Sequence, residues 1–325
     1  MVKDLFNESN RVIKEIINRP SNTFIKNNSS DFAQELEYHN NDLEKYLSFL
    51  YSQQKEDRIF ASFLSYLEDI FFLASDGVTT GLNNYKTLIN RMWDFHGKKH
   101  WGCISFNYDT ILEQSYLIAG RDISERDFSD LESYLNYNPV ILKMHGGINF
   151  RYIFKKPLAD DDSKIYNNHV LFSKMMSESG KVDDFIQTLR IGDGKPNLHS
   201  TLRIIEDGVW KVKSLFNFPL MLIPIHEVVS PENIFFKRLI EHAKEEVSRA
   251  SLIISIGYNF GDEAFLNTIS NLDPIDKEVI LVNTRGEALN INEHSAYQRI
   301  KNAWPGVNVR IFDGDGFDEF MKALR

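Results

Sequence analysis

Polar side chains stand at four places where an apolar run of the sequence stops, and these are the residues best suited to chemistry. The four runs end in Asn107-Tyr108-Asp109, His145-Gly146, Gly257-Tyr258-Asn259 and Asn283. Amide, carboxylate and imidazole groups bind hydroxyls and water, and glycines let a backbone approach a ligand closely. Ligands of open α/β sheets bind beyond the carboxyl ends of the strands. We therefore expect these residues to form one polar rim around a ligand.

Each of these residues also has a simpler interpretation when it is taken alone. Asn107 and Asp109 could cap the helix that follows them, because Asn and Asp are preferred caps. His145 could be a structural histidine. Asn283 could bind a ribose or make an Asx-turn with Thr284.

The turn at Gly257-Tyr258-Asn259 has the composition of an anion site. It lies between an expected strand and an expected helix that begins near Asp262, and Gly261 follows closely. Backbone N–H groups at such a turn favour an anion such as phosphate. The three spaced glycines of the dinucleotide fingerprint are absent, so the spacing alone does not define the ligand.

The elements that must hold the rim alternate along the second part of the chain. Apolar, β-branched runs predict strands at residues 103–106, 140–144, 220–225, 252–257, 279–283 and 307–312. Amphipathic helices are expected at residues 231–250, 262–272, 293–303 and 316–324. This alternation predicts an α/β fold, a Rossmann-like parallel sheet with helices on both faces.

Two regions stand outside that alternation. Residues 1–100 read as a helical N-terminal part, with helices at about 31–52, broken near 39–42, at 57–73 and at 85–95. Residues 151–217 are polar and rich in turn signals, so we expect a small inserted subdomain. The chain is thus divided into residues 1–100 and a core of residues 101–325.

Composition narrows the class of protein. The 325 residues are 42% hydrophobic, carry a net charge of −9 and include one cysteine, Cys103. The charge does not indicate a nucleic-acid surface, and one cysteine excludes a disulfide framework or a cysteine-based zinc site within the chain. Neither a membrane-spanning run nor a signal peptide is recognisable, which predicts a cytoplasmic protein.

Taken in order, the four rim segments resemble the sirtuin family. Ser105-Phe106-Asn107-Tyr108-Asp109 is similar to the signature in which one residue separates Asn and Asp, and Lys143-Met144-His145-Gly146 to the catalytic His-Gly. Ile256-Gly257-Tyr258-Asn259 resembles the turn over the cofactor phosphates, and Ile280-Leu281-Val282-Asn283 the strand that meets the adenosine ribose. The forms seen here look most like the sirtuin-like domains of bacterial anti-phage systems. The resemblance covers roughly residues 101–325 without the insertion.

The resemblance implies cleavage of NAD into nicotinamide and ADP-ribose, with NAD as substrate and no zinc. It assigns catalytic roles to Asn107, Asp109 and His145. Asn107 would orient the ribose and water, Asp109 would favour the developing positive charge, and His145 would be the general base. The implied NAD-binding residues are Ser105, Phe106, Gly146, Gly257, Tyr258, Asn259, Asp262 and Asn283.

One feature of the family is missing from the sequence. The family begins with a strand that carries a Gly-Ala-Gly-x-Ser loop, and no such segment precedes residue 101. Either the chain begins downstream of that strand or the loop has been lost. Two alternative functions therefore stay open: a degenerate module that binds a nucleotide or a partner, and an NAD-dependent protein deacylase.

The remaining expectations concern partners and two other histidines. The resemblance to defence domains implies a homo-oligomer or a partner protein of a defence system. His199 and His226 are expected to be structural, and we find no spacing typical of a metal site.

Overall fold

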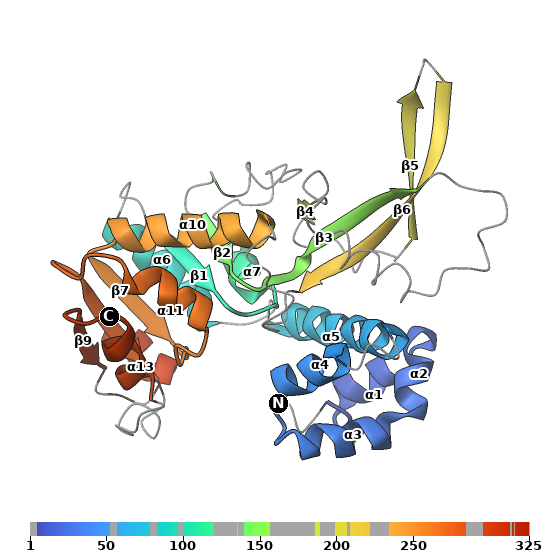
Figure 1. Ribbon diagram of the computed structural model, residues 1–325, viewed down its shortest axis with the longest axis horizontal. Coiled ribbons are helices and arrows are strands. Elements are labelled where there is room, and N and C mark those ends of the chain that lie inside the picture. Colours follow the sequence, from blue (N-terminus) through green and yellow to red (C-terminus); the bar gives the residue numbers. More distant parts are fainter. Residues whose placement is uncertain are drawn as a thin grey trace.

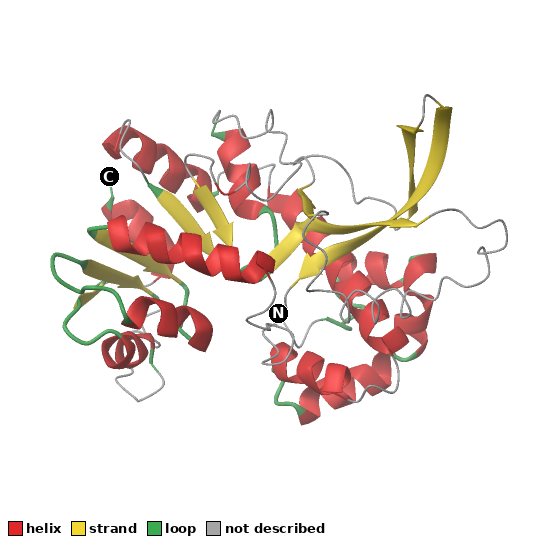
Figure 2. Cartoon of the chain, turned by 45° about the horizontal axis from the view of Figure 1, so that its top comes forward, coloured by secondary structure: helices red, strands yellow, loops and turns green. Residues whose placement is uncertain are grey.

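The computed structural model combines a helical region, parallel strands flanked by helices, and a long antiparallel ribbon (Figure 1). It describes residues 5–52, 57–78, 83–96, 101–119, 135, 140–156, 186–188, 199–206, 209–221, 234–283, 295–312, 314 and 316–324. Figure 2 separates the helices from the strands in a second view.

The N-terminal region is helical, as the apolar periodicity predicts. Its elements are α1 (Arg11–Ile17), η2 (Pro20–Asn22), α2 (Thr23–Asn27), α3 (Ser29–Tyr38), α4 (Leu43–Ser52), α5 (Asp57–Val78) and α6 (Asn84–His96). The expected break near residues 39–42 is confirmed. Asn40 and Asn41 have φ angles of 59° and 57° there, in the left-handed region that interrupts an α-helix.

Five parallel strands and the helices between them follow the predicted order. The strands are β1 (Gly102–Ser105), β2 (Val140–Lys143), β7 (Leu252–Ile256), β8 (Glu278–Val282) and β9 (Asn308–Ile311). The helices are α7 (Ile111–Ile118), α10 (Ile234–Arg249), α11 (Glu263–Ser270), α13 (Ala296–Ala303) and α14 (Gly316–Ala323).

These strands do not form the single sheet that the sequence predicts. Within the described residues β1 pairs with β2, while β7, β8 and β9 form a separate sheet in that order. In the described residues β1 and β7 each have one strand neighbour, and most of their residues are only partly buried. All four residues of β2 are buried. The described fold is mixed helix and strand with two small parallel sheets.

Helices cover both faces of each parallel sheet. On β2, Ile141 packs with Ile89 of α6 and Tyr116 of α7, while Leu142 packs with the cluster that contains Leu239 of α10. The second sheet follows the same rule. Its residues pack against Phe320 of α14 on one side and against Phe265 of α11 on the other.

An antiparallel ribbon leaves the parallel strands directly after His145. It consists of β3 (Gly146–Lys156), β4 (Ile186–Thr188), β5 (His199–Glu206) and β6 (Val209–Met221), in the order β4-β3-β6-β5. β5 and β6 project away from the rest of the chain (Figures 1 and 2).

The ribbon corrects one strand prediction. Leu220 and Met221, expected to begin a parallel strand, instead pair with Gly147 and Gly146 in the antiparallel ladder. The β-branched run after them could not reveal this, because an apolar run does not state its partner. Residues 222–225 lie outside the described residues.

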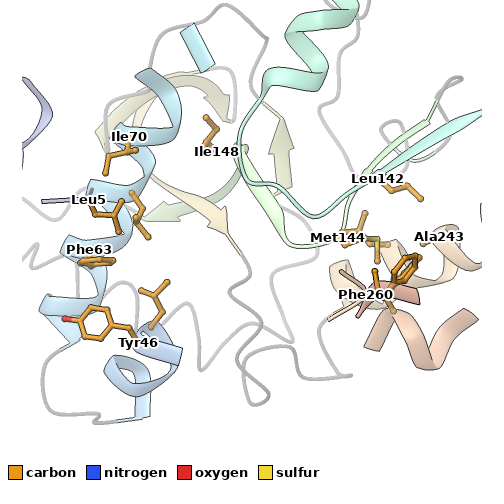
Figure 3. Close-up of a cluster of buried hydrophobic side chains, with 14 of the residues drawn as sticks. Leu5, Tyr46, Phe63, Ile70, Leu142, Met144, Ile148, Ala243 and Phe260 are labelled. Carbon is orange, nitrogen blue, oxygen red and sulfur yellow. The ribbon is translucent and has the colours of Figure 1, made fainter. Parts of the chain in front are cut away.

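A shared hydrophobic core joins the helical region to the strands. Leu5, Phe63 and Ile70 belong to the same cluster as Met144 and Ile148, and all five are buried. Figure 3 shows Ile148 between the labelled side chains of the helical region and those near β2 and α10. The segment that carries His145 is thus anchored by apolar neighbours on both sides in sequence.

Candidate functional site

The centre of the candidate site is a hydrogen-bonded pair from two distant segments. His145 lies in the turn between β2 and β3, and Asp262 lies just before α11. The Nε2 atom of His145 is 2.7 Å from Oδ2 of Asp262. Their side chains are only 7% and 10% exposed, so little water competes for this bond. The pair links the end of the first parallel sheet to the end of the second.

Asp262 has two functions because its two carboxylate oxygens have different partners. While Oδ2 faces the imidazole, Oδ1 accepts a hydrogen bond of 2.8 Å from the backbone N–H of Phe265. Asp262 is therefore the N-cap of α11, with extended backbone angles typical of a cap. The helix fixes the carboxylate, and the carboxylate in turn fixes the ring.

The protonation of this pair follows from its contacts. Burial raises the pKa of Asp262, but the hydrogen bonds from His145 and Phe265 and the charge of His145 outweigh burial, and the net pKa lies below its ordinary value. An ionised carboxylate can only accept, so Nε2 of His145 must donate. In the neutral imidazole the other nitrogen, Nδ1, is then the one that can accept a proton.

Aromatic rings surround the imidazole. Phe106, which follows β1, and Tyr258, which follows β7, stack with centroids 4.0 Å apart and planes at 6°. The Phe106 ring meets His145 edge-on at 5.4 Å, and Tyr108 lies 6.1 Å from the same ring. These rings lower the local dielectric and exclude water, which strengthens electrostatic interactions at the pair.

Asn107 lies between Phe106 and Tyr108 in the sequence, but its side chain is exposed. Its backbone N–H donates to Oγ of Ser105 at 3.2 Å. In the described part of the chain its amide group makes no hydrogen bond, either to His145 or to another residue. The imidazole is held in place, whereas the amide of Asn107 is presented to solvent.

Asp109 takes the capping role that its position before α7 suggested. Its Oδ1 atom accepts a hydrogen bond of 2.9 Å from the backbone N–H of Ile111. The carboxylate also acts at a distance, since the pKa of Tyr85 is raised first by burial and then by the charge of Asp109. This bond uses one of the two carboxylate oxygens, so it does not exclude a role toward a ligand.

The turn after β7 is built on a left-handed glycine. Gly257 has φ +64°, and its N–H donates to the carbonyl of Val282 at 3.0 Å. The side chain of Asn259 is used within the turn, where its Oδ1 accepts from the N–H of Gly261 at 3.0 Å. Arg299 of α13 reaches this turn and donates to the carbonyl of Asn259 at 3.4 Å. A cation therefore stands beside the expected phosphate turn.

Asn283 ends β8 as a buried acceptor. The residue is 5% exposed, and its Oδ1 atom has no hydrogen-bond partner among the described residues. The Oγ atom of Ser255, on β7, is likewise buried without such a partner in that part of the chain. An unpaired buried polar atom costs about 1–3 kcal/mol, so each calls for an explanation.

The structure thus brings together some of the predicted residues and leaves others apart. Phe106, His145, Tyr258 and Asp262 form one contact group. The side chains of Asp109 and Asn259 make separate local hydrogen bonds, and those of Asn107 and Asn283 make none among the described residues. Gly146 opens β3 with φ +69°. His199 belongs to β5 in the ribbon, and His226 lies outside the described residues.

The sequence did not reveal two of the contributing residues or one of the contacts. Asp262 was expected to bind NAD, but its contact with His145 was not foreseen. Lys143 and Arg299 were not singled out at all, although a lysine inside the apolar run 140–144 was a usable signal, because lysine is almost never fully buried unless paired. Arg299 lies on an ordinary amphipathic helix and offered no such signal.

Neither a metal site nor a membrane-spanning helix is found among the described residues. The described residues contain no cluster of three or more His, Cys, Asp or Glu side chains that could hold a metal ion. None of the described helices combines the length and apolar character that crossing a membrane requires. No protein-family model matches the chain. A search of curated proteins likewise returned no match.

Proposed function

We propose that the chain is a sirtuin-like NAD glycohydrolase with a Rossmann-like core, acting as an effector of anti-phage defence. The observation that carries the proposal is the His145–Asp262 hydrogen bond of 2.7 Å, set among Phe106, Tyr108 and Tyr258. It supplies an oriented base in a poorly hydrated environment at the ends of the two parallel sheets. The sirtuin-like order of the rim segments supplies the choice of substrate.

The reaction would need little acid catalysis. Nicotinamide leaves NAD as a neutral molecule when the bond between its ring nitrogen and C1′ of the ribose breaks with both electrons. Positive charge develops on the ribose, and preorganised dipoles and anions stabilise it. The charge of Asp109 and the amide of Asn107 are suited to that task. Water then bonds to C1′ and gives a proton to Nδ1 of His145, which the Asp262 hydrogen bond leaves as the accepting nitrogen.

Two further observations agree with a nucleotide. The buried Oδ1 of Asn283 lacks a partner within the described residues, and a ribose hydroxyl is a suitable donor for it. The cationic side chain of Arg299, which contacts the Gly257 turn, suits a diphosphate. Both features support the adenosine half of NAD as the second point of attachment.

A second candidate is a module that binds a nucleotide or partner without catalysis. Two observations favour it: the amide of Asn107 is exposed, and the described strands form two parallel sheets without a strand between β1 and β7. That is the position of the first strand in the doubly wound order. An oligomer or partner protein is proposed for either candidate.

The decisive experiment mixes purified chain with NAD and measures nicotinamide and ADP-ribose by chromatography. The glycohydrolase predicts release by the wild type that falls at least about 100-fold in Asn107→Ala and His145→Ala, and that persists in Asn302→Ala, which changes an exposed asparagine on α13. Nucleotide binding without release by the wild type would favour the module. Acetyl-ADP-ribose formed from an acetylated peptide would indicate a deacylase.

A further inference from the structure

Lys143 is a charged residue in the buried strand β2. It is 1% exposed, as deeply buried as its apolar neighbours Leu142 and Met144. Its ammonium lies 3.2 Å from Oε1 of Glu113, which is also buried. A charge is tolerated at such a depth only when it is paired and hydrogen-bonded, because desolvation otherwise opposes it. An aliphatic side chain would be the simpler choice for packing at this position.

The ammonium also holds backbone atoms of the loop that follows β1. Its Nζ atom donates to the carbonyl oxygen of Tyr108 at 3.4 Å and to that of Asp109. The two carbonyls accept hydrogen bonds from the ammonium, while Glu113 balances its charge as an ion pair. The ammonium is consequently directed at the backbone of the loop.

Other contacts fix the same loop from different sides. The N–H of Thr110 donates to Oγ of Ser75 on α5 at 3.2 Å, and the N–H of Ile148 on β3 donates to the carbonyl of Tyr108 at 2.9 Å. Glu113 belongs to the first turn of α7, where a negative charge is also favourable for the helix dipole. The backbone of the loop is therefore anchored on three elements, α5, β2 and β3.

We propose that Lys143, paired with Glu113, is a positioning residue that fixes the backbone of residues 107–110 and so sets where Asn107 and Asp109 meet the substrate. Its position supports this role, because Lys143 is the last residue of β2 and stands two residues before His145. One segment thus fixes both the imidazole and the loop that carries Asn107. The kinetic consequence rests on the proposed NAD hydrolysis, while the placement of the loop does not.

The first test is kinetic and uses three variants. Lys143→Met should lower kcat for nicotinamide release by about 100-fold, the loss typical of a catalytic group displaced by about 1 Å, with KM changed by less than about threefold. The double variant Lys143→Met/Glu113→Gln leaves no buried charge unpaired, so it should fold more stably than the single variant. Its kcat should stay low, because the carbonyls of Tyr108 and Asp109 still lack the bonds from the lysine ammonium. Lys244→Met, an exposed site on α10, should behave as wild type.

Recovery of kcat in the double variant along with its stability would overturn the proposal, because Lys143 would then serve folding alone. A second measurement is independent of activity. Amide hydrogen exchange at Thr110 and Ile111 should be at least about tenfold faster in Lys143→Met, since the loop that protects these amides loses its anchor. Exchange rates equal to those of wild type and Lys244→Met would also overturn it. If the wild type releases no nicotinamide, the proposed activity fails, and exchange alone decides the role of Lys143.

Discussion

The double role of Asp262 can be separated by two substitutions at one position. Asp262→Ala removes the N-cap bond to Phe265, worth about 1 kcal/mol, and the charged hydrogen bond to His145, worth about 1.5–3 kcal/mol. The expected loss in the free energy of unfolding is about 2.5–4 kcal/mol. Asp262→Asn keeps a capping oxygen, since Asn is as good a cap as Asp, and should lose only the second part. The measurement is urea denaturation at constant ionic strength.

A matched control gives the value of a cap alone. Ser295 caps α13, which has the same length as α11, and its Oγ accepts from the N–H of Gln298 at 3.2 Å. Ser295→Ala should therefore cost about 1 kcal/mol. A loss in Asp262→Ala no larger than that of Ser295→Ala would refute the view that the His145 bond adds stability.

The same pair gives a pH dependence with a definite sign. The folded-state pKa of Asp262 lies below its ordinary value of 3.8. Its contribution to stability is thus complete above the ordinary value and is lost as the pH falls through the lower, folded-state pKa. The difference in the free energy of unfolding between wild type and Asp262→Asn should shrink over that interval. A difference that is unchanged from about pH 5 to about pH 2 would contradict the assignment.

Two further predictions concern the glycine turn and the cysteine. Gly257→Ala should destabilise the chain by about 1–2 kcal/mol in urea denaturation, because φ is +64° and a side chain there would meet open space, so only backbone strain counts. Gly316, with φ +74° and open space, should give a similar loss, and no loss at either position would contradict the backbone argument. Burial raises the pKa of Cys103 to about 11, against a smaller lowering by its hydrogen bond with Tyr116. Its thiol should react with iodoacetamide at about pH 8 at least about 100-fold more slowly in the folded chain than in urea, and equal rates would contradict the raised pKa.

The sequence predicted the elements better than their assembly. Strands such as Leu252–Ile256 and Glu278–Val282 are predictable from the sequence, because apolar β-branched residues bounded by turn signals favour strands. The partners of a strand depend on contacts far along the chain, which no local pattern encodes. That is why the division into two parallel sheets and the capture of Leu220 by the ribbon were not foreseen.

The candidate site was predicted by residue type and only partly by contact. His145 and Asp262 were both named, yet they are 117 positions apart, and only the tertiary structure joins them. Conversely, the cap formed by Asp109 was foreseen because a cap is local, acting on the N–H two residues later. A carboxylate that caps a helix with one oxygen can still bind a ligand with the other. Which partner the second oxygen has depends on the tertiary structure, so the sequence alone does not predict it.

The separation of the parallel strands into two ladders has a mechanical consequence. Backbone hydrogen bonds make each ladder stiff, but among the described residues none runs from β1 to β7. Near the carboxyl ends of their strands the two parallel sheets are joined by side-chain contacts, the Phe106–Tyr258 stack and the His145–Asp262 hydrogen bond. If the two sheets slid slightly past each other, the Phe106–Tyr258 stack and the His145–Asp262 bond would both be strained. The imidazole would then lose its fixed orientation without any break in the backbone hydrogen bonds of either sheet.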